Sequence, residues 1–351
     1  MGITSRTLMT IAALLLSQSY ISVFINPVKL WWANLFGLLF IPLAFLNLFL
    51  LVWAIFRRSM TFMIPLVALV PAWFISGLYY QKGEVLPSPS ESDVKIVSYN
   101  VGRFGASKEK MTPEQCADSV VALLKGEKAD IICLQEFYLD DISNVNRWLS
   151  GRFKGYYVDY YVYPRPDGCF GNVILSRYRF KEKGKIEFEN SANLAIYGDC
   201  TINGQDLRIY NCHFQSYNLS LPHLVKSVRK DYREAMKYTE EKMKFSVPVR
   251  ARQVDTVLRH IEDCPLEAVV TGDFNDTPLS YTYRRMSKGR NDSFCEAGHG
   301  FGATFYALKP LLRIDYVLGP ERFDVVGHEV VNKRFSDHYP VTAKIRIAKD
   351  H

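Results

Sequence analysis

Two side chains able to bind a metal ion or to move a proton follow a short apolar run at Ala268–Val270. Asp273 and Asn275 stand two residues apart, just after Gly272, and this spacing places both side chains on one side of an extended chain. The continuous hydrophobicity and β-branching of Ala268–Val270 are typical of a strand that is buried on both faces. One carboxylate and one carboxamide are therefore expected to face the same small volume.

Several other apolar segments end in the same way, at an acid, an amide or an imidazole. These are Lys95–Tyr99 with Asn100, Ile131–Leu134 with Gln135 and Glu136, Leu207–Tyr210 with Asn211 and His213, and Ile314–Leu318, which contains Asp315 and precedes Asp337, His338 and a last strand at Val341–Ile347. Helical segments separate these strands, and this alternation predicts two packed sheets flanked by helices. Polar groups at the strand ends are then expected to share a pocket.

The ordered set of motifs resembles the endonuclease/exonuclease/phosphatase superfamily over about residues 94–347, as a membrane-anchored, bacterial-type member. The pattern from Gly171 and Asn172 to Ser176 and Arg177 is similar to the same superfamily. The resemblance implies a DNase I-like, four-layer α/β/β/α sandwich with its pocket at one end. It also implies an enzyme that hydrolyses phosphate esters with a divalent metal ion.

The resemblance implies a role for each polar strand end. Glu136 is the expected principal metal ligand, with Asn100 and Asp337 nearby. Asp273 is expected to orient and deprotonate the attacking water, and Asn275 to hold the phosphate or the nucleophile. Taken alone, the Asp-x-Asn-Asp pattern at 273–276 is typical of an Asx turn, and the companion motifs favour the catalytic interpretation.

Two histidines complete the expected site. His338 follows Asp337 directly, and Asp315 is expected to orient its ring so that a charged imidazolium stabilises the phosphoryl oxygens. His213 is similar to the second histidine of the deoxyribonuclease and sphingomyelinase branches and is a candidate to protonate the leaving oxygen. The other histidines match no motif and are expected at the surface or in packing: His223, His260, His299, His328 and His351.

The expected metal is Mg²⁺ or Mn²⁺, because hard oxygen ligands suit these ions. Neither cysteine nor histidine residues cluster at zinc spacing. The seven cysteines include no Cys-x-x-Cys pair, and Cys133 and Cys212 fall inside apolar strands, where free cysteine behaves as a small hydrophobe. The sequence therefore predicts neither a zinc site nor a disulfide framework.

The first part of the chain is apolar enough to enter a membrane. No charged residue occurs in residues 8–24, 30–56 or 59–80, and about 20 apolar residues cross a bilayer as a helix. Three transmembrane helices are predicted, at about 8–24, 31–56 and 59–80. A cleavable signal peptide is the alternative for the first, but the two further apolar stretches argue against it. The predicted organisation is a membrane domain at 1–82, a linker at 83–93 and a catalytic domain at 94–351.

Basic residues near the expected spans predict the orientation. Arg6, Arg57 and Arg58 belong to one side and Lys29 and Lys82 to the other, so the positive-inside rule places Arg57 and Arg58 in the cytoplasm. A multi-pass plasma or inner membrane protein with an extracytoplasmic catalytic domain follows. Unpaired cysteines favour, mildly, a reducing compartment instead. No obligate protein partner is inferred.

The sequence leaves the substrate open. A net charge of +7 over 351 residues is compatible with anionic partners, though a solvated basic surface is as good an explanation. The favoured interpretation is a phosphodiesterase of the nuclease type, and the alternative is a sphingomyelinase-like lipid phosphodiesterase acting on membrane headgroups. The inositol-phosphate phosphatase branch, and with it a phosphomonoesterase, is disfavoured because Arg313–Tyr316 lacks the Trp-x-Asp-Arg element of that branch. A non-catalytic scaffold is disfavoured because every expected catalytic position is filled.

Overall fold

The computed structural model describes residues 2–83, 87–88, 90–105, 111–189, 191–219 and 221–347, without the side chains of residues 221–225. The chain forms two compact units. The helical unit comprises Met1–Tyr79, Ser216–Arg252 and Asp276–Met286, and the sheet unit comprises Tyr80–Gln215, Gln253–Asn275 and Ser287–His351. This grouping differs from the expected division at residues 82 and 94, because two later segments join the N-terminal helices. The expected linker includes residues 84–86 and 89, which lie outside the described residues.

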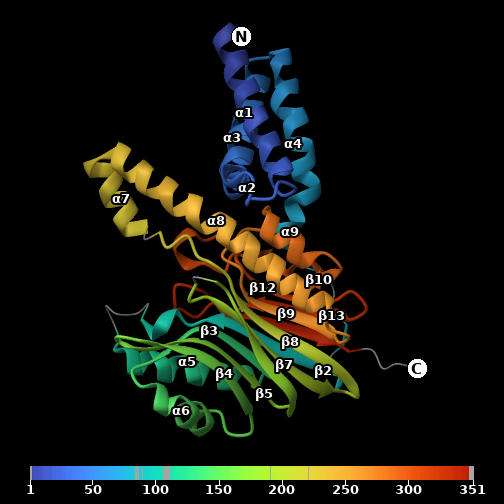
Figure 1. Cartoon of the computed structure of the whole chain (residues 1–351). Helices are drawn as coiled ribbons and strands as arrows, with labels where there is room; N and C mark the ends of the chain where they lie inside the picture. The colour runs from blue at the N-terminus through green and yellow to red at the C-terminus, as the bar shows by residue number, and fades with distance from the viewer. Residues whose placement is uncertain are drawn as a thin grey trace. The chain divides into compact units, whose positions relative to one another are not determined.

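Two six-stranded sheets form the sheet unit (Figure 1). The strand order of the first sheet is β13 (Asp324–Val330), β14 (Val341–Arg346), β2 (Asp93–Asn100), β3 (Ile131–Leu139), β5 (Gly168–Ser176) and β4 (Tyr157–Arg165). The order of the second is β10 (Arg290–Asp292), β12 (Asp315–Pro320), β9 (Glu267–Asp273), β8 (Gln205–His213), β7 (Leu194–Ile202) and β6 (Phe180–Glu187). The pairs β2–β3 and β8–β9 run parallel. Parallel neighbours end at the same edge of a sheet, so each pair delivers its last residues to one place.

Apolar side chains from both sheets fill the space between them. Ile131 and Ile174 of the first sheet and Ile209 and Val269 of the second belong to one buried cluster. Each is at most 2% exposed, and burying such a side chain contributes roughly 1.5–3 kcal/mol. The predicted packing of two sheets against each other is confirmed.

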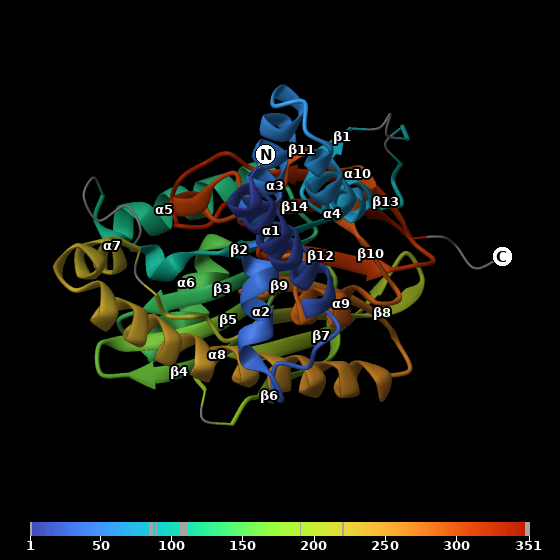
Figure 2. The same ribbon diagram turned by 90° about the horizontal axis from the view of Figure 1, so that it is seen from above.

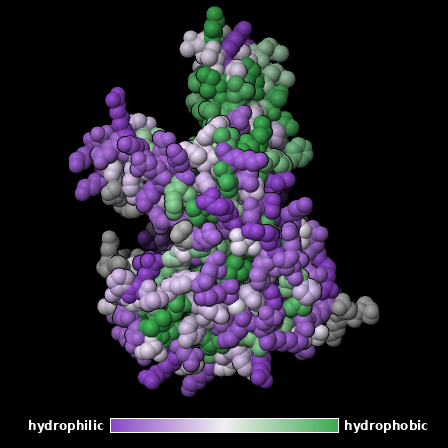
Figure 3. Space-filling view, viewed as in Figure 1, coloured by the Kyte–Doolittle hydropathy of each residue, from purple (hydrophilic) through white to green (hydrophobic). Residues whose placement is uncertain are grey.

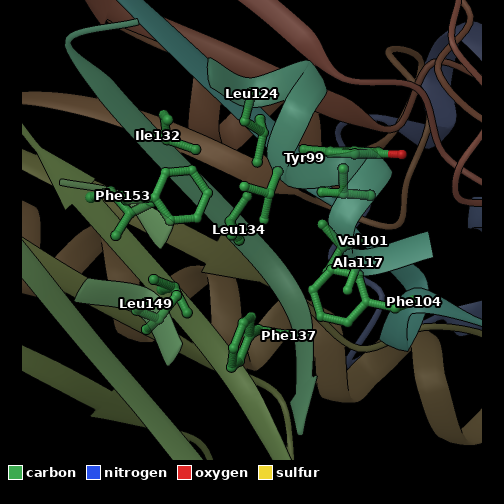
Figure 4. Packing of buried hydrophobic residues seen from close by; sticks show 14 of the residues in the cluster. Tyr99, Val101, Phe104, Ala117, Leu124, Ile132, Leu134, Phe137, Leu149 and Phe153 are labelled. Atoms are coloured by element: carbon green, nitrogen blue, oxygen red, sulfur yellow. The ribbon is translucent and has the colours of Figure 1, made fainter. Parts of the chain in front are cut away.

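Helices cover the outer face of each sheet (Figures 1 and 2). On the first sheet lie α5 (Pro113–Glu127) and α6 (Val145–Arg152), whose Leu124 and Leu149 pack with Leu134 and Phe137 of β3 (Figure 4). The last turns of α8 (Tyr232–Glu262) lie on the second sheet, where His260 Nδ1 is 2.9 Å from the hydroxyl of Tyr210. The sheet unit is thus layered as helix, sheet, sheet and helix.

The start of α5 has the capping residues that the sequence predicts. Thr112 Oγ1 accepts a hydrogen bond from the backbone N–H of Gln115, and the Gln115 side chain accepts one from the N–H of Thr112. Proline follows at the first helical position, Pro113, where its missing N–H has no partner to lose. Such a capping box satisfies two N–H groups that would otherwise lack acceptors.

Shorter elements lie outside the two six-stranded sheets. They are β1 (Tyr80–Lys82), which pairs with β11 (His299–Phe301), the helix α10 (Ser293–Ala297), and the 3-10 helices η4 (Gly102–Phe104), η5 (Ile142–Asn144) and η6 (Tyr306–Leu308).

The helical unit begins with four helices and three 3-10 turns. They are α1 (Ile3–Ser22), η1 (Trp31–Ala33), α2 (Asn34–Leu38), α3 (Phe40–Phe56), η2 (Met60–Phe62), α4 (Met63–Ile75) and η3 (Ser76–Leu78). Hydrophobic residues gather on the surface of these helices (Figure 3). Later in the chain, α7 (Leu221–Lys230), most of α8 and α9 (Tyr281–Ser287) also fall in this unit.

The expected number of membrane spans is not supported. Of the described helices, Met60–Leu78 is by itself long and apolar enough to cross a membrane, and Trp31–Leu38 with Phe40–Phe56 passes as a pair bent by 55°. The bend has a local cause: Pro42 lacks an N–H for the carbonyl of Leu38, and in a continuous helix its ring would collide with that carbonyl. The first helix carries Arg6 and several hydroxyl side chains, which reduce its hydropathy. The structure thus offers one or two candidate spans where the sequence predicts three.

Segments from distant parts of the chain pack together within the helical unit. Leu279 belongs to a buried cluster with Leu16, Val23 and Phe40. A Cβ added at Gly37 would lie 1.9 Å from the carbonyl oxygen of Leu279, so α2 approaches this segment as closely as a glycine allows.

Candidate active site

The residues predicted to do chemistry lie where the two parallel strand pairs end. In the first sheet, Asn100 at the end of β2 pairs with Gln135 of β3, the residue before Glu136. In the second sheet, His213 at the end of β8 pairs with Asp273 at the end of β9. On the other side of β9 lies β12, whose first residue, Asp315, pairs with Asp273.

A glycine allows β9 to approach β8 closely. Gly272 has φ +133°, which L side chains rarely adopt, and a Cβ there would lie 1.9 Å from the carbonyl oxygen of Cys212. No other residue fits without moving one of the strands. Gly272 therefore determines where the next residue, Asp273, stands beside His213.

The backbone of β3 turns Glu136 out of the regular strand pattern. Its φ is +53°, and the pairing of β3 with β5 shifts register between Leu134 and Phe137. A bulge of this kind redirects a side chain. The Glu136 side chain is 28% exposed, so its carboxylate stands at the mouth of the site rather than in the core.

Asp273 is the centre of the hydrogen-bond network. Its Oδ1 accepts from the backbone N–H of Asn275 at 2.8 Å. Its Oδ2 accepts from Nδ2 of Asn100 at 2.9 Å and from Nδ2 of Asn275 at 3.2 Å. Asn100 also donates to Oε1 of Glu136 at 3.3 Å, and so joins the two carboxylates.

His338 contacts Asp315 through one ring nitrogen and faces Asp273 with the other. Nδ1 lies 2.9 Å from Asp315 Oδ2, and Nε2 lies 3.7 Å from Asp273 Oδ2. Backbone N–H groups of Ile314 and Asp315 donate to Thr304 Oγ1, each at 3.1 Å, which fixes the start of β12. Asp315 is therefore well placed to orient the ring of His338.

His213 points into the same volume without a hydrogen bond. Its Nε2 lies 3.6 Å from Glu136 Oε1 and 4.0 Å from Asp273 Oδ2. The side chain is 3% exposed, and neither ring nitrogen has a hydrogen-bond partner among the described residues. A buried ring with unsatisfied nitrogens is costly, so His213 is placed to meet a group that enters the site.

Burial and neighbouring charges separate the protonation states of the two histidines. Burial lowers the pKa of His213, and the opposing effect of Asp273 does not restore it. Burial alone would also lower the pKa of His338, but the carboxylates of Asp315 and Asp273 hold it well above the ordinary value. The two effects thus favour the neutral imidazole at His213 and the imidazolium at His338.

Both carboxylates that Asn100 joins bind protons more readily than usual. Burial raises the pKa of Asp273 to about 6, although the positive charge of His338 opposes it. Burial also raises the pKa of Glu136, and the charge of Asp337 adds to this effect. A carboxylate with a pKa near neutrality is matched to the task of a general base.

Asp337 lies beside the turn that follows Asn100. Its Oδ1 would be 3.0 Å from a Cβ added at Gly102, and its charge acts on Glu136. Two neighbouring carboxylates form an arrangement that a divalent ion stabilises. The oxygen donors of Asn100, Glu136 and Asp337 fit Mg²⁺ or Mn²⁺.

A second group of possible ligands overlaps this site. Asp273, Asp315 and His338 each place one ligand atom within 4.8 Å of the others. The hydrogen bond between Asp315 and His338 Nδ1 accounts for part of this closeness. The predicted assignment of the metal to Asn100, Glu136 and Asp337 stays a prediction.

The structure adds a buried polar network that the sequence did not assign to the site. Gln135 Nε2 donates to Asn211 Oδ1 at 2.7 Å. The Asn211 amide donates to the carbonyls of Leu134 and Val173, both at 2.9 Å. These bonds join the two sheets directly behind Glu136. Both residues stand at strand ends in the sequence, and that position was the available signal.

Two basic residues near the pocket also escaped the sequence analysis. Arg103 follows Asn100 and Gly102 in a backbone with φ +55°, and its guanidinium lies 4.8 Å from the ring centroid of Phe170. Arg165 approaches the same ring at 5.8 Å. No motif in the sequence marks either residue.

The unassigned histidines take packing or surface positions where the structure describes them, and His299 in β11 is exposed. His260 contacts Tyr210, and His328 Nδ1 lies 2.9 Å from Ser293 Oγ. The side chain of His223 and the whole of His351 lie outside the described residues.

Comparison with known families agrees with this geometry. Residues 97–338 match the family described as Endonuclease/Exonuclease/phosphatase family. Residues 4–79 match a second family, described as a domain of unknown function. Among curated proteins no match is found.

Several solved structures share the fold. The human Nocturnin catalytic domain with bound sulfate is 15% identical with a TM-score of 0.55, covering 73% of this chain and 95% of that chain. An endonuclease/exonuclease/phosphatase family protein from Bacteroides thetaiotaomicron is 17% identical with a TM-score of 0.52, covering 72% and 97%. D. rerio TDP2 complexed with a single-strand DNA product is 17% identical with a TM-score of 0.51, covering 73% and 100%. At these identities the likeness shows the fold. Since the family match spans more than half of the chain, this protein belongs to the endonuclease/exonuclease/phosphatase family of phosphoesterase hydrolases.

Proposed function

We propose that this protein is a divalent-metal-dependent phosphodiesterase of the nuclease type. The observation that supports it best is the set of contacts on Asp273 Oδ2, which accepts hydrogen bonds from Asn100 and Asn275. The Nε2 atoms of His338 and His213 lie 3.7 and 4.0 Å from the same oxygen. A water molecule and a phosphoryl group at this point would meet a base, a cation and neutral donors together.

In the proposed reaction, Asp273 accepts a proton from water while the water oxygen forms a bond to phosphorus. The ester P–O bond on the opposite side breaks, and the leaving oxygen takes a proton from solvent to become an alcohol, while Asp273 releases the proton that it accepted to solvent. His338 stabilises the negative charge of the phosphoryl oxygens as an imidazolium held by Asp315. Asn275 holds the phosphate or the water without adding charge.

His213 is assigned to the leaving oxygen. Burial lowers its pKa, which disfavours the proton donor expected from the sequence. We propose instead that the neutral ring donates a hydrogen bond to that oxygen. A divalent cation bound by Glu136, Asn100 and Asp337 would supply further neutralisation of the phosphoryl charge.

A second candidate function is a lipid phosphodiesterase that acts on membrane headgroups. The apolar surface of the helical unit (Figure 3) and its one or two candidate spans favour it. We propose that these helices attach the protein to a membrane, with the loop at Arg57 and Arg58 in the cytoplasm and the sheet unit on the outer side.

The two candidates are separated by assaying the full chain in detergent micelles with Mg²⁺. Oligonucleotides, sphingomyelin-like lipids and small phosphomonoesters serve as parallel substrates. Cleavage of oligonucleotides is expected. Exclusive cleavage of lipid would replace the first function with the second, and cleavage of phosphomonoesters alone would refute both.

Variants connect the activity to the site. Asp273→Asn, His338→Ala and Glu136→Ala are each expected to lower kcat/KM by about 10²–10³ or more, since each removes an acid–base or electrostatic contribution. Full turnover by His338→Ala would show that the role assigned to this histidine is wrong.

A further inference from the structure

Three side chains of the sheet unit form a small basic surface beside the proposed catalytic groups. Phe170 of β5 is 5% exposed, and two guanidiniums approach its ring, Arg103 at 4.8 Å and Arg165 at 5.8 Å from the centroid. The ring of Phe170 also lies 6.2 Å from the ring of His213. The aromatic ring therefore connects the two arginines to the site.

Different elements hold the two arginines in place. Arg103 belongs to η4, directly after Asn100, where the backbone adopts φ +55°. Arg165 is the last residue of β4 and pairs with Gly168 of β5. Cation–π contact with a buried ring restricts each side chain, so both guanidiniums are preorganised rather than free.

Neither arginine has an ion-pair partner in the described part of the chain, and both are exposed. Exposed Arg322 and half-buried Arg346, by contrast, do have acidic partners. Two uncompensated cations beside a phosphoester site attract additional negative charge.

We propose that Arg103 and Arg165 form a subsite for a second phosphate of the substrate, adjacent to the phosphate that is cleaved. This inference rests on the proposed phosphodiesterase function and deepens it. It identifies the substrate as a phosphodiester strand, that is, a nucleic acid or oligonucleotide. A choline headgroup carries a quaternary ammonium that two guanidiniums would repel, so the surface selects against that lipid.

The test compares thymidine oligonucleotides of two and four residues, which differ in having one or three phosphodiesters. The full chain in detergent is expected to prefer the tetranucleotide by at least about tenfold in kcat/KM. Arg103→Ala and Arg165→Ala are each expected to reduce this preference about fivefold to tenfold, in line with the loss of a charged hydrogen bond. The dinucleotide rate should change little, and lysine at either position should restore part of the preference.

A matched control is Arg322→Ala. Arg322 is exposed and lies 4.8 Å from the ring of Phe323, the same distance as Arg103 from Phe170. Arg322 follows Pro320, the last residue of β12, whereas Asp315 of the site is the first residue of that strand. The control is expected to keep the full preference for the tetranucleotide.

Salt dependence gives a second readout. Each phosphate contact adds about 0.7 to the slope of log affinity against log salt for a single strand. Binding of the tetranucleotide to an Asp273→Asn chain, followed by fluorescence anisotropy, should therefore lose about this much slope with each arginine removed.

The outcomes are distinct. Equal loss of dinucleotide and tetranucleotide cleavage in the arginine variants would overturn the subsite, as would a wild type without a length preference. If the wild type cleaves no oligonucleotide but binds the tetranucleotide through both arginines, the subsite stands and the proposed function fails. Absence of both cleavage and arginine-dependent binding would refute both.

Discussion

Asp273 shows how single residues make this site chemically active. A buried carboxylate is costly unless donors surround it, and here Asn100 and Asn275 donate to both of its oxygens while His338 brings a positive charge near it. Its pKa still rises to about 6 because burial outweighs these contacts. Glu136, by contrast, stands partly exposed on a bulge, where it can take a ligand from solvent.

Glu136→Gln tests the metal assignment. The substitution removes one negative charge and one carboxylate oxygen, so the Mg²⁺ concentration for half-maximal activity should rise about tenfold or more. Titration of Mg²⁺ into the chelator-treated full chain measures this value. Glu321→Gln, which removes an exposed acid outside the site, should leave it unchanged, and an unchanged value for Glu136→Gln would remove this residue from the metal site.

His328 predicts a pH dependence of stability. Burial lowers its pKa from 6.5 to about 4, and its Nε2 has no hydrogen-bond partner among the described residues. The unfolded state therefore binds the extra proton first, so this contribution to stability is complete above pH 6.5 and is lost as the pH falls towards 4. Between pH 7 and pH 5 the loss is about 1–2 kcal/mol.

Urea unfolding at the two pH values, for wild type and His328→Phe, isolates this residue. The phenylalanine variant should lose less stability on acidification than the wild type. Identical losses would show that the ring of His328 already binds a proton in the folded protein.

At the scale of elements, the site depends on where strands end and how closely they approach. The parallel pairs β2–β3 and β8–β9 bring their last residues to common edges. Gly272 then sets the distance between β8 and β9, and the bulge at Glu136 sets the direction of one side chain. These are backbone properties that no single functional residue controls.

Gly272→Ala should therefore be severely destabilising. The new Cβ would lie 1.9 Å from Cys212 O in a backbone with φ +133°, so the strands must separate and Asp273 must move. The expected loss is about 3 kcal/mol or more, from overpacking added to backbone strain, with loss of most activity.

Gly204→Ala separates strain from collision. Gly204 also has positive φ, +87°, but its Cβ would meet nothing within 4 Å. The expected cost is about 1 kcal/mol, without loss of activity. Equal effects of the two variants on the unfolding midpoint would show that close strand approach is not what requires Gly272.

At the scale of the whole molecule, the two units interleave along the chain. Asn275 ends one segment of the sheet unit, and Asp276 begins a segment of the helical unit. Asp276 Oδ2 lies 3.2 Å from Arg250 Nε, and Asn34 Nδ2 lies 3.5 Å from Asp276 Oδ1. Arg250 and Asn34 therefore fix Asp276 within the helical unit.

Gly37→Ala tests the packing of α2 on Leu279 within the helical unit. In an exposed helix, replacing glycine by alanine stabilises by about 0.5–1 kcal/mol, and Gly126→Ala in α5, with open space around the new Cβ, should show that gain. Gly37→Ala should instead destabilise by about 1–3 kcal/mol, because its Cβ would collide with Leu279 O. Thermal unfolding of the full chain in detergent measures both, and stabilisation by Gly37→Ala would contradict the packing of α2 on Leu279.

The sequence by itself determined the two-sheet architecture and the residues that meet at its edge. Hydrophobic runs that end in Asn100, Glu136, His213 and Asp273 are local features, and burial forces such runs into strands wherever the chain folds. The capping box at Thr112 is local in the same sense. Patterns of this kind are readable because their physical cause lies within a few residues.

Only the tertiary structure decided the rest. Several features depend on contacts between residues that are far apart in the chain. Such contacts shift the pKa values of His213 and His338 in opposite directions. They also place Arg103 and Arg165 on the ring of Phe170, and they join Asp276 to Arg250 and Asn34. The expected three spans failed for a related reason: the first helix begins at Ile3 and so includes Arg6, and the second apolar stretch is bent by 55°, neither of which the apolar composition shows. Electrostatics and close packing depend on three-dimensional distance, which the order of residues does not contain.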